Sequence, residues 1–311
     1  MGKTKIGWTE HVWNPIRGCS KVSEGCKHCY AERMAARFCG KGEPYHGLID
    51  PVTRSWTGRV ELIESKLDEP LHRRIPTTYF VNSMSDLFHP SLTFEQIRQV
   101  WCGMTALSAR HHTYIILTKR YERMADFFNY LHSKIWHEYG VDATETEGIP
   151  DVLHLPQPHI WLGHSYSNQR DADLGYGHLV NTPARIRFLS LEPLLGEIDL
   201  DSLLPGGLTR GKGGWCTGPD WVIAGGESGP DARPMHPDWV MALRDQCAGA
   251  GVPFWFKQWG SFGYWDQMPD ESVRILDAAG ELASDKPYYV GKKLAGDFLD
   301  GKQYKQRPEG W

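Results

Sequence analysis

The sequence lacks a long hydrophobic run. No stretch of its 311 residues approaches the roughly 18 consecutive apolar residues that a membrane-spanning helix needs. The first residues, MGKTKIGWTEHVW, also lack the apolar segment that secretory signals carry. These two absences predict a cytoplasmic protein without a membrane partner.

The sequence also lacks an excess of basic charge and contains little cysteine. Its formal net charge is −4, whereas proteins that bind duplex nucleic acid through its phosphates are usually basic. Nonspecific nucleic-acid binding is therefore not indicated. The seven cysteines are an odd number, and cytoplasmic thiols stay reduced. A tight group of cysteines in such a chain favours a metal site over a set of disulfides.

The sequence does contain a regular alternation of apolar runs and amphipathic stretches. The apolar runs predict strands at 77–83, 113–118, 159–165, 185–191, 220–226 and 252–260. Helical spacing predicts helices at 30–39, at 94–109 with Thr93 as N-cap, and at 119–131, 168–180 and 236–251.

Continuously apolar strands that alternate with helices indicate a parallel sheet covered on both faces. We expect an α/β fold, specifically a partial or complete parallel (β/α) barrel of the TIM type, with a doubly wound open sheet as the alternative. The barrel is expected to occupy residues 1–260, with insertions near 132–158 and 201–219. Residues 261–311 are predicted to be a C-terminal extension that packs on the barrel. No GxGxxG follows the first strand, which disfavours dinucleotide binding.

Each predicted strand is followed by charged or hydrogen-bonding residues. Because the C-terminal ends of parallel strands converge on active sites in α/β folds, we expect these residues to line one mouth. They are Ser83, Asp86, Lys119, Arg120, His164, Ser190, Glu192, Glu227, Ser228, Lys257 and Gln258. The catalytic candidates among them are Asp86, Lys119, Glu192, Glu227 and Lys257. The alternative is that polarity simply returns where a strand ends.

Three cysteines stand close together in GCSKVSEGCKHCYAE, residues 18–32: Cys19, Cys26 and Cys29. A zinc ion would need a fourth ligand, for which His28 and Cys39 are the candidates. A [4Fe–4S] cluster usually takes four thiolates, so three would leave one iron open to an exogenous ligand. That is the arrangement needed to bind and cleave S-adenosylmethionine (SAM). The spacing alone leaves an iron–sulfur cluster, zinc and no metal as open alternatives.

Six motifs, read in order, resemble the phage and prophage "gene product thirty-seven / sixty-eight" family, a domain of unknown function with a radical-SAM-like cysteine motif. They are WTEHVWNPIRGCSKVSEGCKHCYAERMA, VNSMSDLFH, LTKR, FLSLEPLLG, WVIAGGESGPDARP and FWFKQWG, over about residues 6–260. The tail KKLAGDFLDGKQY, at 292–304, resembles the family's C-terminal end. In this chain six residues and then two separate the cysteines, where radical SAM proteins most often have three and then two.

The resemblance implies a [4Fe–4S] cluster on Cys19, Cys26 and Cys29, with SAM as a second cofactor. It implies that the segment after the first barrel strand, Ser83, Met84, Ser85 and Asp86, meets the methionyl end of SAM. Later strand ends, with Lys119, Ser190 and Glu192, would hold the ribose and adenine. Tyr30, Gly225 and Gly226 complete the predicted cofactor-binding residues. The two glycines allow close backbone approach to a ligand, which Glu227 would then face.

The expected function is that of a radical SAM enzyme, which uses an electron from an external donor to form a 5′-deoxyadenosyl radical and modify a substrate. A nucleic-acid base or nucleotide is the candidate substrate, because of the phage-like relatives and the many tryptophans. A phosphate-facing patch would then consist of Arg120, Arg170, Arg185, Arg187, Arg233 and Lys257. The alternatives are a noncatalytic scaffold, or a zinc-stabilised nucleic-acid-binding or hydrolytic protein. In the zinc protein a second metal would bind Asp86, Glu192 and Glu227.

Overall fold

The computed structural model describes residues 2–4, 6–140, 154–202, 218–264, 267 and 287–310. The chain divides into two compact units. The first unit comprises Met1–Val22, Ala31–His164 and Asn181–Arg187, and the second comprises Ser23–Tyr30, Ser165–Val180 and Phe188–Trp311. The central parts of both predicted insertions, and much of the predicted C-terminal extension, lie outside the described residues.

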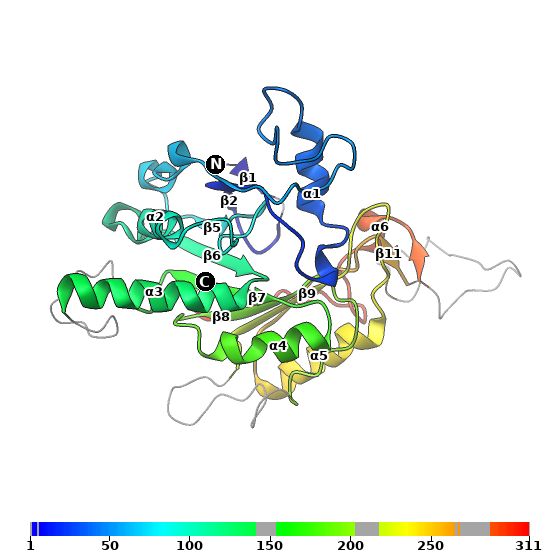
Figure 1. Ribbon diagram of the computed structural model, residues 1–311. Helices are drawn as coiled ribbons and strands as arrows, with labels where there is room; N and C mark the ends of the chain where they lie inside the picture. The colour runs from blue at the N-terminus through cyan, green and yellow to red at the C-terminus, as the bar shows by residue number, and fades with distance from the viewer. Residues whose placement is uncertain are drawn as a thin grey trace, which may run out of the picture. The chain divides into compact units, whose positions relative to one another are not determined.

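The first unit is built on a mostly parallel sheet (Figure 1). Its strands follow in the order β1 (Gly2–Lys3), β2 (His11–Trp13), β5 (Thr78–Val81), β6 (Thr113–Thr118) and β7 (Ile160–Ser165). Only β1 pairs antiparallel among these neighbours, and the register places Val81 of β5 opposite Trp13 and Ile116. A separate two-stranded sheet joins β3 (Ile16–Arg17) to β4 (Glu61–Leu62).

Two amphipathic helices pack against each other in this unit, α2 (Phe94–Thr105) and α3 (Tyr121–Tyr139). The predicted N-cap is confirmed, because the Thr93 side chain accepts from the Gln96 N–H while the Gln96 side chain accepts from the Thr93 N–H. Apolar side chains of both helices and of β2, β5, β6 and β7 form one continuous core. Helix α1 (Tyr30–Ala35) follows the cysteine segment.

The second unit contains three parallel strands in the order β8 (Arg187–Leu191), β9 (Trp221–Gly225) and β10 (Phe254–Gln258). Helices α4 (Gln169–Val180) and α5 (Pro237–Ala250) belong to the same unit (Figure 1). A short antiparallel pair, β11 (Phe262–Gly263) with β12 (Tyr288–Tyr289), and the short helix α6 (Lys292–Ala295) follow. The chain then returns to β10, where Phe256 N–H donates to Tyr304 O at 2.9 Å.

The structure confirms the predicted α/β class with a large, mostly parallel sheet. All six predicted strands are present, and 113–118 coincides with β6. The strand order is open, and no closed ring of strands occurs within the described part of the chain. Among the described residues, no helix has the length and apolar character needed to cross a membrane.

The tryptophans mostly build the core. Seven are buried: Trp8, Trp13, Trp101, Trp161, Trp221, Trp255 and Trp259. Trp136 is the one described tryptophan among the exposed large hydrophobic residues. Most of the described tryptophans are therefore core residues, and their number no longer supports a nucleic-acid substrate.

Candidate functional site

In the first unit, the loop after β5 holds the chain that leads to Cys19. Asn14 Oδ1 accepts from Ser83 Oγ at 3.2 Å and from the Met84 N–H at 3.4 Å. Ser85 Oγ donates to Ile16 O at 3.0 Å, and the backbones of Ser85 and Gly18 form a parallel bridge. The segment predicted to meet SAM therefore lies directly beside the first cysteine.

Asp86 closes this loop with a dense set of hydrogen bonds. One carboxylate oxygen accepts from Thr118 Oγ1 at 2.8 Å and from the Phe88 N–H at 3.0 Å. The other accepts from the Lys119 N–H at 3.2 Å and from Arg120 Nη1 at 2.9 Å. The side chains of Asp86 and Arg120 are each only 8% exposed, so this ion pair is buried.

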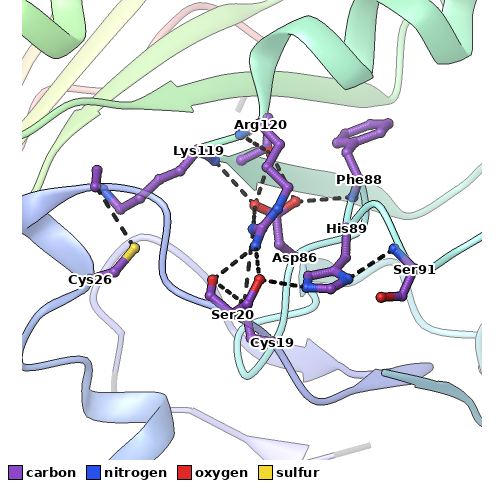
Figure 2. Close-up of polar contacts among 11 residues, drawn as sticks. Cys19, Ser20, Cys26, Asp86, Phe88, His89, Ser91, Lys119 and Arg120 are labelled. Carbon is purple, nitrogen blue, oxygen red and sulfur yellow. Dashed lines mark hydrogen bonds and ion pairs between the residues drawn. The ribbon is translucent and has the colours of Figure 1, made fainter. Parts of the chain in front are cut away.

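Arg120 connects Asp86 to the cysteine segment (Figure 2). Its Nη2 donates to Ser20 O at 2.8 Å and to Ser20 Oγ at 3.0 Å, and its Nη1 lies 3.9 Å from Cys19 Sγ. Burial by itself lowers the pKa of Arg120, but the charges of Asp86 and Cys19 outweigh it and the net shift is upward. A permanent positive charge therefore lies beside the first cysteine.

His89 completes this group from the other side of Ser20. Its Nδ1 accepts from the Ser91 N–H at 3.2 Å, so the proton of the neutral ring is on Nε2, which donates to Ser20 Oγ at 2.8 Å. Burial, with the charge of Arg120 next, lowers the pKa of His89 from 6.5 to about 4. The imidazole is therefore neutral at physiological pH.

We expect this histidine to make the fold sensitive to mild acid. Its folded-state pKa lies below the unfolded value of 6.5, so only the unfolded chain gains a proton as the pH falls from about 6.5 to 4. The free energy of unfolding should drop by about 2 kcal/mol between roughly pH 7 and pH 5, as measured by urea unfolding. His89→Gln should lose this part of the pH dependence, and His72→Gln, which removes an exposed imidazole, should keep it. Equal pH slopes in the wild type and His89→Gln would contradict the assignment.

In the second unit, Glu192 and Lys257 form an ion pair at the ends of β8 and β10. Lys257 Nζ lies 2.9 Å from one oxygen of Glu192 and 3.1 Å from the other, and Ser190 Oγ donates to Glu192 at 3.2 Å. The two charged side chains are 14% and 25% exposed, so they retain access to solvent. Three of the predicted site residues thus meet in one polar group.

Gly225 makes room for that group. A Cβ at Gly225 would lie 2.8 Å from Glu192 Oε1 and 3.3 Å from Gln258 O. At Gly226 it would lie 1.8 Å from Trp259 O, and the Gly226 N–H donates to Gln258 O at 2.9 Å. These glycines are required for close approach between strand ends within the unit.

Glu227 is buried and belongs to a second carboxylate–arginine pair. Its Oε2 accepts from Arg233 Nε and from the Arg233 N–H, both at 2.9 Å, and its Oε1 accepts from Arg233 Nη2 at 2.8 Å. Arg233 Nη2 also donates to Glu24 O at 2.9 Å. Burial alone raises the pKa of Glu227, but the hydrogen bonds from Arg233 dominate and the net shift is downward.

None of the three predicted metal ligands forms a disulfide, and each is partly exposed. Cys19 belongs to the first unit, whereas Cys26 and Cys29 belong to the second. Within the described residues, no group of three His, Cys, Asp or Glu side chains is already arranged as a metal site. The donor set itself fits an iron–sulfur cluster, since reduced, accessible thiols are the ligands that such clusters take.

The contacts of Cys39 do not favour it as a fourth zinc ligand. Its Sγ donates to Ala36 O at 3.3 Å and accepts from Arg54 Nη1 at 3.3 Å, and the residue packs against a small apolar cluster with Ile49. The carboxylates proposed for a second metal are likewise in use, because Asp86, Glu192 and Glu227 each pair with a cation. Both findings weaken the zinc alternative.

The first unit also has a cavity of about 360 Å³ away from these groups. It is lined by Lys3, Thr4, Glu10, His11, Arg73, Ile75, Pro76 and Thr77. These residues precede or begin β2 and β5, so the cavity lies at the opposite ends of those strands from the predicted site residues.

Sequence reasoning missed several residues that organise these groups: Asn14, Ser20, His89, Thr118 and the backbone role of Arg233. Asn14 shortly precedes the cysteine motif and Ser20 lies within it, and this closeness in sequence was an available signal. The phosphate-facing patch is not supported at three of its members, because Arg120, Arg233 and Lys257 are paired with carboxylates. Tyr30, predicted to contact a cofactor, is 48% exposed.

The family model described as "Protein of unknown function (DUF5131)" matches residues 3–308. The chain belongs to this family. No curated protein matches the chain. Among solved structures it is similar to a mutant spore photoproduct lyase with bound AdoMet and dinucleoside spore photoproduct, at 10% sequence identity and a TM-score of 0.39. That similarity covers 83% of this chain and 58% of the length of the lyase chain. The phage origin of the family stays a prediction.

Proposed function

We propose that this member of the family is a radical SAM enzyme that holds a [4Fe–4S] cluster on Cys19, Cys26 and Cys29. The observation that carries the proposal is the presence of three partly exposed cysteines, none of them in a disulfide, within eleven residues of one segment. The spacing leaves no fourth thiolate in that segment, so one iron would stay open for an exogenous ligand. With SAM on that iron, an electron from an external donor would yield the 5′-deoxyadenosyl radical.

The residues around the first cysteine would bind and orient SAM. Ser83, Met84 and Ser85 lie on the loop that contacts the chain leading to Cys19, which favours them as neighbours of the methionyl end. In the second unit, the Ser190–Glu192–Lys257 group is partly exposed and could hydrogen-bond a ribose or a base. Of the five predicted catalytic residues, Lys119, Glu192 and Lys257 stay the candidates for a chemical role, whereas Asp86 and Glu227 are each held by an arginine and are assigned a structural role. A nucleic-acid base or nucleotide stays a candidate substrate, without support from the tryptophans.

Metal analysis of single cysteine variants tests the cluster. The wild type and its variants would be purified without oxygen, reconstituted with iron and sulfide, and analysed for iron, sulfide and zinc. Cys19→Ser, Cys26→Ser and Cys29→Ser should each lose most of the iron and the visible absorption. Cys39→Ser is the matched control and should keep both.

This set of variants also separates the two metal alternatives. A chain that holds one zinc and loses it in Cys39→Ser as well would establish a four-ligand zinc site and overturn the proposal. Equal iron in Cys19→Ser and the wild type would remove the first cysteine from the ligand set.

A further inference from the structure

We propose that the stretches of the cysteine segment that carry Cys19 and Cys26 are each positioned by a carboxylate–arginine pair whose carboxylate is buried. This inference rests on the proposed function, because the positioning of the thiols serves a purpose only if they bind a metal. The four residues of the two pairs are then positioning residues, and the GGESGPDARP motif contributes Glu227 and Arg233, which contact the segment at Glu24. The pairs belong to different units, and each makes its contacts inside its own unit.

The first pair holds the backbone at Ser20. Arg120 makes a charge-assisted bond to Asp86 and donates twice to Ser20, once to its carbonyl and once to its hydroxyl. The carboxylate is itself fixed by Thr118 Oγ1 and by two backbone N–H groups. The guanidinium therefore has one orientation, and that orientation fixes the residue directly after Cys19.

The ion pair between Lys21 and Glu32 also holds this stretch of backbone, beside the Asp86–Arg120 pair. Lys21 Nζ lies 2.8 Å from Glu32 Oε2, and Glu32 Oε1 accepts from the Trp56 N–H at 2.9 Å. Glu32 is buried although it lies on a short helix, as a carboxylate with two fixed partners can be. Ser20 and Lys21, the two residues that follow Cys19, are thus each bound to a different part of the first unit, Ser20 to Arg120 and Lys21 to Glu32.

The second pair holds the turn that carries Cys26. Both carboxylate oxygens of Glu227 accept hydrogen bonds from Arg233, and Arg233 Nη2 also donates to Glu24 O. The same carbonyl accepts from the Lys27 N–H at 3.1 Å, and the Cys26 N–H donates to Ser23 O at 2.9 Å. Arg233 therefore fixes the short turn that presents the second cysteine.

A lysine could not replace either arginine. Each arginine uses separate N–H groups of one planar fork, one on the carboxylate and one on a backbone carbonyl of the cysteine segment. An ammonium group is a compact point charge without that fixed geometry. An arginine-to-lysine variant keeps the positive charge but loses the planar guanidinium, so it separates positioning from a simple need for positive charge near the thiolates.

Hydrogen exchange of the metal-free, reduced protein tests the inference apart from any cluster. In Arg233→Gln and Glu227→Gln, the amides of Cys26 and Lys27 should exchange at least tenfold faster than in the wild type. The amides of Val240 and Leu243 in α5 should be unchanged and serve as the reference for the second unit. Arg244→Gln, which breaks the pairs of Arg244 with Asp245 and Asp300, is the matched control and should leave Cys26 and Lys27 unchanged.

The reconstituted protein supplies the second readout, the rate of iron loss to a chelator. Arg120→Gln, Arg120→Lys, Arg233→Gln and Arg233→Lys should all lose iron at least tenfold faster than Arg244→Gln. Rescue of iron retention by the lysine variants would overturn positioning in favour of charge alone. Unchanged exchange at Cys26 and Lys27, or acceleration shared with α5, would also overturn it. A chain that binds no iron but shows the local acceleration would refute the proposed function and leave the positioning by the two pairs standing.

Discussion

Replacing Gly18 with alanine should be among the most destabilising single changes in this protein. Gly18 has φ = +87°, and a Cβ there would lie 2.1 Å from Arg59 O. An L-residue in this left-handed region costs roughly 1–2 kcal/mol of folding free energy. The clash adds to this cost, because the Arg59 oxygen belongs to the backbone and cannot rotate away as a side-chain atom could. We expect the free energy of unfolding to fall by more than about 4 kcal/mol in urea titrations.

Gly58→Ala is the matched control for this change. Gly58 has φ = +83°, and a Cβ there would meet nothing within 4 Å, so this position carries the backbone strain without the clash. The substitution should cost only about 1–2 kcal/mol. Equal losses for the two variants would show that the approach of Arg59 to Gly18 is not as close as the structure has it. The result bears on function, since Gly18 directly precedes Cys19.

Removing the charge of Asp86 should have a second large effect. Asp86→Asn leaves Arg120 buried without its counter-ion, and breaking a buried pair in this way typically costs about 3–5 kcal/mol. Three further donors, Thr118 Oγ1 and the N–H groups of Phe88 and Lys119, would also lose an ionised acceptor. The measurement is again the free energy of unfolding at neutral pH.

The exposed pair of Glu95 and Arg98 provides the comparison. Glu95→Gln breaks an ion pair whose side chains are 47% and 37% exposed. Solvent screens such a pair, so the loss should stay below about 1 kcal/mol. If Asp86→Asn cost no more than Glu95→Gln, the buried pair would not be what holds the loop after β5.

The fold could be predicted well because local patterns carry it. Parallel strands that are covered on both faces are continuous apolar runs, and 113–118 was predicted with the bounds that β6 has. Thr93 was identifiable as an N-cap because Gln96 follows at the capping-box spacing. Helix α3 was predicted too short, since it continues past Leu131 to Tyr139 and ends only where Gly140 adopts a left-handed conformation.

The site was harder to predict because its pairs join residues far apart in the chain. Strand ends were identified as polar, but the sequence does not show that Asp86 meets Arg120, 34 residues away, or that Arg233 reaches back to Glu24. Glu227 was expected to face a ligand, which stays a prediction, but the three hydrogen bonds that its carboxylate accepts from Arg233 were not foreseen. Partners of this kind depend on tertiary geometry, which local sequence patterns do not encode.

The most direct test of the central claim is the EPR spectrum of the reduced, reconstituted protein with and without SAM. We expect about four irons per chain and a cluster signal that changes when SAM is added. Both should be absent from a variant in which Cys19, Cys26 and Cys29 are all alanine. A colourless protein that holds one zinc per chain, or a cluster signal that SAM leaves unchanged, would contradict an open iron on these three thiols.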